Sequence, residues 1–169
     1  MKRFVTALLI TTGVIQLSAA ELVWNNEAAF RNWKAEKNVR MTIENNMIKL
    51  SDIAFDHHIM IPNLNLDATL YNRVSITYRA TPSESKPGQK FYGQIFYTHT
   101  GTSMNSRMFW RISPLQRDGK WHTVVLNPSD LLNQKSWFKG GPITALRLDI
   151  TDAPGGTIEI KELKFYFQK

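Results

Sequence analysis

The chain has 169 residues, a formal net charge of +7 and no cysteine. Without cysteine, a disulfide framework and a lipoprotein anchor are both excluded, so the fold must rest on its hydrophobic core. A positive charge suits an acidic partner. However, the sequence contains no run of five or more like charges and no basic helix, which argues against nucleic acid.

Residues 1–20 have the pattern of a secretory signal peptide. A basic start precedes an apolar run that ends at Leu17, and small residues follow up to Ala20. The apolar run is shorter than the roughly 17 to 25 residues that a membrane span requires. We therefore expect cleavage after Ala20 and a mature chain from Glu21 that has no membrane span. Such a protein would be periplasmic or secreted.

Short stretches of alternating apolar and polar residues recur along the mature chain, whereas helical periodicity is almost absent. In residues 73–80, for example, Val74, Ile76 and Tyr78 would share a buried face. We expect strands over residues 39–44, 47–53, 57–61, 73–80, 91–99, 107–112, 121–126, 143–150 and 157–167. Short helical turns are expected over 27–33 and 128–132, a hairpin turn at 45–46 and a loop over 81–90.

This pattern predicts a single all-β domain over residues 21–169. Many short strands separated by frequent turns favour a two-sheet antiparallel β-sandwich, most simply a jelly roll. A closed barrel is the alternative, and the uneven strand lengths argue against it. Trp24, Trp33, Trp110 and Trp121 are expected in the core. Trp137 is expected to plug one end of the sandwich, with a stacking platform in a loop as the alternative.

The polar positions of the predicted strands combine aromatic, amide and charged side chains. Sugars bind by stacking their C–H faces on aromatic rings while amides and charged groups hydrogen-bond the hydroxyls, and arginine also recognises carboxylate or sulfate. We expect one ligand-binding face made of Arg73, Arg79, Tyr92, Gln94, Phe96, Phe109, Arg111, Arg147 and Asp149. The alternative is structural: Phe96 and Phe109 lie under the loop of residues 81–90, and the arginines pair with Asp149 and its neighbours.

Several stretches carry a resemblance to a known fold family. They contain Trp24, Phe30, Trp33, Asp56, residues 66–68, Tyr71, residues 74–79, residues 118–122, Trp137, residues 146–149 and residues 158–161. This series resembles galactose-binding-like jelly rolls and the carbohydrate-binding-module-like domains of exported bacterial glycan-processing proteins. The resemblance implies a non-catalytic carbohydrate-binding domain. It also implies a structural Ca²⁺, for which Asn25, Glu27, Asp149 and Glu159 are the candidate oxygen ligands.

Two other functions stay open. A small polysaccharide lyase would need His, Tyr and Arg side chains, and the chain contains these residue types. No Gly-x-Ser-x-Gly turn is present, and no spacing demands a pair of facing carboxylates. His57 and His58 are adjacent on a predicted strand, so they would point to opposite faces and could not ligate one ion together. A structural or protein-interaction domain of the cell envelope is the third hypothesis. The leading hypothesis is binding of a glycan, for which an acidic polysaccharide would suit the arginines.

Overall fold

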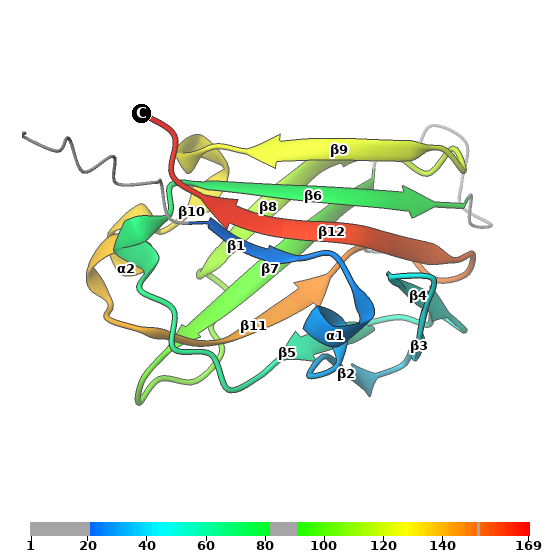
Figure 1. Ribbon diagram of the computed structural model, residues 1–169, viewed down its shortest axis with the longest axis horizontal. Helices are drawn as coiled ribbons and strands as arrows, with labels where there is room; N and C mark the ends of the chain where they lie inside the picture. Colours follow the sequence, from blue (N-terminus) through cyan, green and yellow to red (C-terminus); the bar gives the residue numbers. More distant parts are fainter. Residues whose placement is uncertain (1–20, 82–90, 152) are drawn as a thin grey trace, which may run out of the picture.

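Two antiparallel sheets pack face to face in the computed structural model, which describes residues 21–81, 91–151 and 153–169 (Figure 1). The predicted β-sandwich is confirmed. The described strands form two separate sheets, each with edge strands, and not one closed barrel. The predicted signal peptide and residues 82–90 of the predicted loop lie outside the described residues. Among those described, no helix combines the length and apolar character that a membrane crossing requires.

Sheet A has the strand order β3-β4-β12-β6-β9, and β1 pairs with β12 beside it. Its strands are β1 (Glu21–Trp24), β3 (Arg40–Glu44), β4 (Met47–Ser51), β6 (Arg73–Ala80), β9 (Trp121–Leu126) and β12 (Ile158–Tyr166). In Figure 1, β12 and β6 run side by side across the front of the molecule. The first strand that the structure describes, β1, therefore pairs directly with the last, β12.

Sheet B has the strand order β10-β8-β7-β11-β5-β2. Its strands are β2 (Lys34–Lys37), β5 (His58–Ile61), β7 (Phe91–His99), β8 (Phe109–Leu115), β10 (Leu131–Leu132) and β11 (Ile143–Asp149). Four short helical segments connect the strands: α1 (Glu27–Phe30), α2 (Gln134–Lys139), η1 (Ala68–Leu70) and η2 (Pro128–Asp130).

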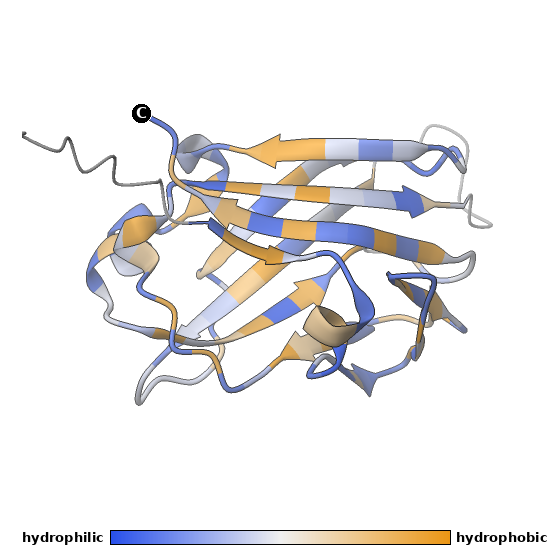
Figure 2. Cartoon of the chain, viewed as in Figure 1, coloured by the Kyte–Doolittle hydropathy of each residue, from blue (hydrophilic) through white to orange (hydrophobic). Residues whose placement is uncertain are grey.

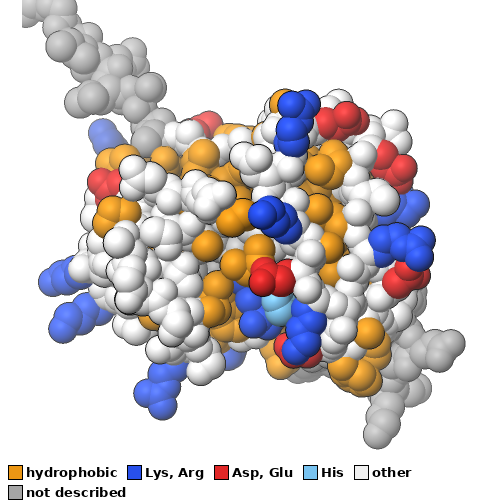
Figure 3. Space-filling view, turned by 90° about the horizontal axis from the view of Figure 1, so that it is seen from below, with side chains coloured by type: hydrophobic (Ala, Val, Ile, Leu, Met, Phe, Trp, Pro, Cys, Tyr) orange, Lys and Arg blue, Asp and Glu red, His pale blue; other side chains and the backbone are white. Residues whose placement is uncertain are grey.

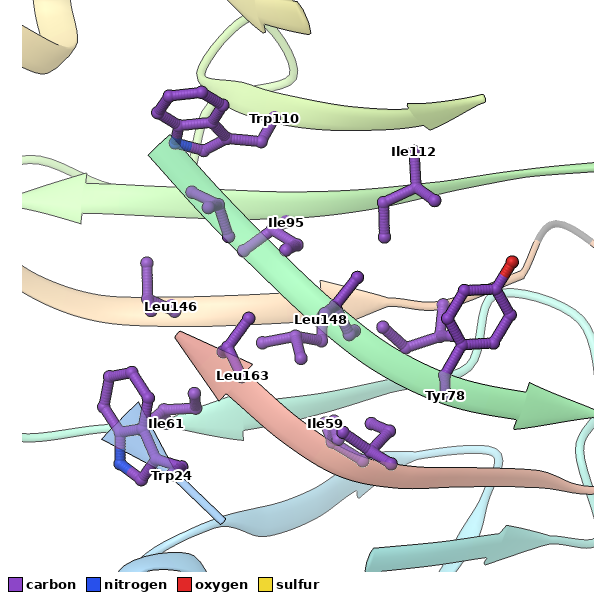
Figure 4. Close-up of a cluster of buried hydrophobic side chains, with 14 of the residues drawn as sticks. Trp24, Ile59, Ile61, Tyr78, Ile95, Trp110, Ile112, Leu146, Leu148 and Leu163 are labelled. Atoms are coloured by element: carbon purple, nitrogen blue, oxygen red, sulfur yellow. The ribbon is translucent and has the colours of Figure 1, made fainter. Parts of the chain in front are cut away.

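The core lies between the inner faces of the two sheets. Hydropathy alternates along most strands, so each sheet turns one face inward and the other to solvent (Figure 2). Figure 4 shows Tyr78 of β6, Leu163 of β12 and Leu148 of β11 in one cluster of buried hydrophobic side chains. All three side chains are at most 1% exposed, and burial of each of the two leucines contributes about 1.5 to 3 kcal/mol.

The sequence predicted the strands with strong alternation accurately. It missed elements in which the alternation is weak or absent. The bounds predicted for β6, β7 and β9 are confirmed, as is the turn at Asn45 and Asn46, which have φ angles of 53° and 58°. The sequence missed β2, because all its residues are exposed and no alternation marks it. It also missed β1 and α2, which are too short to show a period.

The tryptophans divide between the core and the surface. Trp24, Trp33 and Trp110 are buried as predicted, and Trp137 is fully buried, which confirms the plug. The rings of Trp137 and Phe165 stack at 5.8 Å. The prediction for Trp121 was wrong: it is 40% exposed on the outer face of sheet A. In β9 the more buried positions belong to His122, Val124 and Leu126, so the alternation turns Trp121 outward.

Candidate functional site

The outer face of sheet B gathers most of the predicted binding residues. Gln94 of β7 lies opposite Arg111 of β8 and Asp149 of β11. One row along, Phe96 lies opposite Phe109 and Arg147. Because side chains two residues apart share a face, these two rows and Tyr92 form one continuous surface across three neighbouring strands. Its members are Tyr92, Gln94, Phe96, Phe109, Arg111, Arg147 and Asp149.

Arg73 and Arg79 are not part of this surface, because β6 belongs to sheet A. Arg79 forms an ion pair with Glu159 on the outer face of that sheet, and its Cζ lies 4.9 Å from the centroid of the Trp121 ring. Arg73 donates a hydrogen bond to the carbonyl oxygen of Asn72 at 2.9 Å. The single face predicted from the sequence is therefore two faces on opposite sides of the sandwich.

The two phenylalanines form a covered floor on this surface. The ring centroids of Phe96 and Phe109 are 5.2 Å apart. The Cζ atom of Arg147 lies 5.2 Å from the Phe96 centroid, and that of Arg111 lies 5.7 Å from the Phe109 centroid. The phenylalanines are only 8% and 4% exposed, so their rings are closed to a ligand in this arrangement. Tyr92, by contrast, is 44% exposed. Residues 82–90, the loop expected to cover Phe96 and Phe109, lie outside the described residues.

Ion pairs neutralise Arg147, as the structural alternative expected. Its guanidinium donates two hydrogen bonds to the Asp149 carboxylate, at 2.7 and 2.6 Å, and also lies 3.5 Å from Asp56. These hydrogen bonds raise the pKa of Arg147 above its ordinary value. Lys37 in turn donates to Asp56 and lowers the pKa of that carboxyl group. This end of the surface therefore carries balanced charges that hold one another in place.

Three adjoining hollows cross the outer face of sheet B. The first, of about 300 Å³, is lined by Phe109, Arg111, Ser113, Ser129, Asp130, Leu131 and Leu132. The second, of about 320 Å³, is lined by Tyr92, Gln94, Arg111 and Ser113. The third, of about 190 Å³, is lined by Asp56, His57, Tyr92, Gln94, Asp149 and Thr151. Neighbouring hollows share lining residues, so together they form one groove, which we call the sheet B groove.

The sheet B groove runs from β10 across β8 and β7 to β11, a distance of about 14 Å at the usual strand spacing. At its centre an exposed phenol ring, an amide, a guanidinium and a hydroxyl converge: Tyr92, Gln94, Arg111 and Ser113. Arg111 is in no ion pair with any residue that the structure describes, and its guanidinium lies over the Phe109 ring. Figure 3 views the molecule from the side of β11, β5 and β2, where Lys, Arg, Asp and Glu side chains surround a histidine beside exposed hydrophobic atoms.

The third hollow depends on close packing between β7 and the end of β11. A Cβ atom at Gly93 would lie 2.9 Å from the carbonyl oxygen of Ile150 and 3.2 Å from that of Asp149. Glycine therefore allows the end of β11 to approach β7 at this point. This approach sets Asp149 beside Gln94 in the groove wall.

His57 was not among the predicted binding residues, but it lines the third hollow. It is 3% exposed, and its Nδ1 donates to the carbonyl oxygen of Ala54 at 3.0 Å. Nε2 is buried without a hydrogen-bond partner among the described residues. Burial lowers the pKa of His57, so the neutral form is favoured.

Sequence reasoning also missed Ser113 and Asp130. The strand predicted over 107–112 continues to Leu115 through Pro114, a residue that argues against a strand interior. If the predicted strand had been extended past residue 112, alternation would have placed Ser113 on the same face as Arg111.

The four candidate calcium ligands do not come together. Asp149 pairs with Arg147 on the outer face of sheet B, whereas Glu159 pairs with Arg79 on that of sheet A. Glu27, the first residue of α1, accepts a hydrogen bond from the backbone N–H of Asn46, and the Asn25 side chain accepts one from Asn26. Within the described residues, no three His, Cys, Asp or Glu side chains are grouped to hold a metal ion. Structural calcium stays an untested expectation.

Comparisons with solved structures identify the architecture. A family 29 carbohydrate-binding module aligns with a TM-score of 0.56 and 11% identity, covering 88% of this chain and 93% of that one. The low-affinity xylan-binding module CBM86 from Roseburia intestinalis gives 0.50 and 13%, with 86% and 94% covered. A family 11 module from Clostridium thermocellum, in complex with a β-1,3-1,4-mixed-linked tetrasaccharide, gives 0.51 and 12%, with 88% and 96% covered.

The chain has the jelly-roll fold of carbohydrate-binding modules. At these identities the likeness establishes the fold and leaves the ligand to the site itself. No protein-family model matches the sequence, and no curated protein matches it.

Proposed function

We propose that this chain is an exported, non-catalytic glycan-binding domain whose ligand lies in the sheet B groove. The observation that carries the proposal is the convergence of exposed Tyr92 with Gln94 and Arg111 in one groove. A sugar ring stacked on the phenol would leave its hydroxyls within reach of the amide and the guanidinium. The fold shared with carbohydrate-binding modules, among them a xylan-binding module, supports this proposal.

The ligand we propose is an acidic glycan, recognised through Arg111. A guanidinium binds a carboxylate or sulfate with two parallel hydrogen bonds. Arg147 is occupied by Asp149 and Asp56, whereas the structure shows no ion pair of Arg111 within the residues it describes and places its guanidinium over the ring of Phe109. One anionic group per binding site therefore matches the free donors of the groove.

A polysaccharide lyase is supported less well, although His57 and Tyr92 line the same hollow. A general base must reach the proton that it removes, but Nε2 of His57 is buried and Nδ1 is bonded to Ala54. A glycosidase acid requires a raised pKa, whereas the pKa of Asp56 is lowered. Both features favour binding over catalysis.

Affinity electrophoresis of residues 21–169 through gels that contain uronic-acid or neutral polysaccharides tests the proposal. We expect retardation by at least one uronic-acid polysaccharide and a loss of about tenfold or more in affinity for Tyr92→Ala. Phe167→Ala is the matched control, since Phe167 is also an exposed aromatic residue, at 43%, but follows β12 of the opposite sheet. Folded wild-type protein that migrates freely in every gel would contradict glycan binding and favour a structural or protein-interaction role.

Calorimetry at low and high salt tests the acidic ligand separately. Arg111→Ala should lower affinity by about 5- to 100-fold, the loss of a charged hydrogen bond, and should flatten the salt dependence because the Coulombic attraction is removed. Arg79→Ala, whose side chain lies on sheet A, should change neither. Equal binding of neutral and acidic glycans by wild-type protein and by Arg111→Ala would reject the acidic ligand but keep the groove.

A further inference from the structure

The edge strands of the two sheets differ in how they are protected against pairing with another chain. Edge strands are normally protected from pairing with other chains by charge, by bulges or by being very short. Three of the edges are protected by charge: β1 contains Glu21, β2 contains lysines and a glutamate, and β3 contains Arg40 and Glu44. The edge strand β10 has only two residues.

The remaining edge strand, β9, has none of these protections. Its sequence from Trp121 to Leu126 contains no Lys, Arg, Asp, Glu or Pro. Among the described residues it pairs only with β6, in a continuous register without a bulge. Within the part of the chain that the structure describes, one side of its backbone therefore has unpaired N–H and C=O groups, and Figure 1 shows β9 at the margin of sheet A.

The outward side chains of β9 are self-complementary about Thr123. In an antiparallel pair of two β9 strands centred on this residue, Thr123 faces its own copy. Trp121 then faces Val125 of the other chain on the same face of the sheet. Trp121 is 40% exposed and Val125 45%, so each chain offers one exposed aromatic and one exposed β-branched side chain to the other. Such cross-strand pairs stabilise antiparallel sheets, and no charge faces a like charge within the strand.

We propose that two copies of this chain associate through β9, which joins their A sheets into one continuous antiparallel sheet. The Arg79–Glu159 ion pair beside Trp121 is already neutralised and does not repel the partner. The sheet B groove lies on the other sheet, so each copy keeps its groove open. This surface is independent of the proposed glycan site, and its test requires no glycan.

Single-cysteine variants test the proposal directly, because the natural chain contains no cysteine. Facing residues in an antiparallel pair have Cα atoms about 4.5 to 5.5 Å apart, within the range that a disulfide spans. Thr123→Cys should therefore form a disulfide-linked dimer under mild oxidation. Thr42→Cys is the matched control: Thr42 is also an exposed threonine on an edge strand of sheet A, but it lies on the charged edge strand β3.

Analytical ultracentrifugation of the uncrosslinked protein provides the second measurement. Residues 21–169 should show a monomer–dimer equilibrium that Val125→Lys shifts to monomer by about tenfold or more in dissociation constant, while Thr42→Lys leaves it unchanged. Circular dichroism would show that both variants remain folded. A monomer at every concentration, or equal crosslinking of Thr123→Cys and Thr42→Cys, would overturn the proposal, even if a foreign peptide were found to bind the β9 edge.

Discussion

The guanidinium of Arg147 and the carboxylate of Asp149 form a two-point ion pair along one face of β11, with hydrogen bonds of 2.7 and 2.6 Å. This pair keeps the guanidinium over the ring of Phe96, where it forms part of the floor beside the sheet B groove. The carboxylate also lines the third hollow of that groove. The pair therefore links the packing of the surface to the shape of the site.

Removing the charge of Asp149 should destabilise the protein. Asp149→Asn leaves a half-buried guanidinium with a weaker partner, and we expect a loss of about 1 to 2 kcal/mol in the free energy of unfolding, measured by urea denaturation. Asp52→Asn is the control because its ion pair with Arg40 is largely exposed and should contribute less than about 1 kcal/mol. Equal effects of the two substitutions would show that the Arg147–Asp149 pair has no special structural role.

Two tryptophans should differ sharply in their contribution to stability. Trp137→Ala removes a fully buried ring that packs on Phe165, Tyr97 and Trp110, and should lower the free energy of unfolding by about 3 to 5 kcal/mol. Trp121→Ala removes a ring that is 40% exposed and should lower it by less than about 1.5 kcal/mol. Chemical denaturation of both variants measures the difference, and similar losses would contradict the plug.

Stability should fall in mildly acidic solution because His57 is buried. Burial lowers the pKa of His57 in the folded protein below its ordinary value of 6.5, so above that pH both states are neutral at this residue. As the pH falls below 6.5, the unfolded state binds a proton that the folded state resists, and stability is lost until the pH reaches the folded pKa. After burial, the largest influence on the pKa of His57 is the hydrogen bond to Ala54, which raises it; the nearby charge of Asp149 also raises it, whereas Arg117 and His58 lower it.

Urea denaturation between about pH 7.5 and pH 5 measures this loss, above the range in which carboxylates titrate. His57→Gln should show a smaller decrease over the same range, whatever its stability at neutral pH. An identical slope in wild-type protein and the variant would assign the pH dependence to another group.

Export makes a separate prediction from the first residues of the chain. Protein recovered from the periplasm or medium of an exporting host should begin at Glu21, as determined by mass spectrometry of the intact chain. Recovery of chains that still begin with Met1 from those compartments would contradict cleavage after Ala20.

The sequence predicted the sandwich well because alternation encodes which side chains face inward. In β7 it separated Ile95 and Tyr97 from Gln94 and Phe96, and the structure confirms that division. Alternation does not encode which sheet a strand joins. Arg79 and Arg111 therefore looked equivalent in the sequence, although their strands lie in different sheets.

The sequence did not predict the sheet B groove, because residues distant in the chain form it and alternation within one strand does not show which strands and loops meet. Asp56 enters it from a loop, and Asp130 and Leu132 enter it because β10 pairs with β8. The two phenylalanines were predicted as stacking rings, but arginines of the same face cover them. Only Tyr92 kept the exposed aromatic surface that the sequence predicted for the site.

The most direct test of the account is an NMR titration of isotope-labelled residues 21–169 with a polysaccharide fragment that binds in the electrophoresis panel. We predict that the largest shifts of backbone amides cluster at Tyr92, Gln94 and Arg111, and that Tyr92→Ala weakens the binding while the protein stays folded. Shifts concentrated instead around Trp121 and Thr123 on sheet A, or spread evenly over the surface, would contradict the assignment of the sheet B groove as the glycan site.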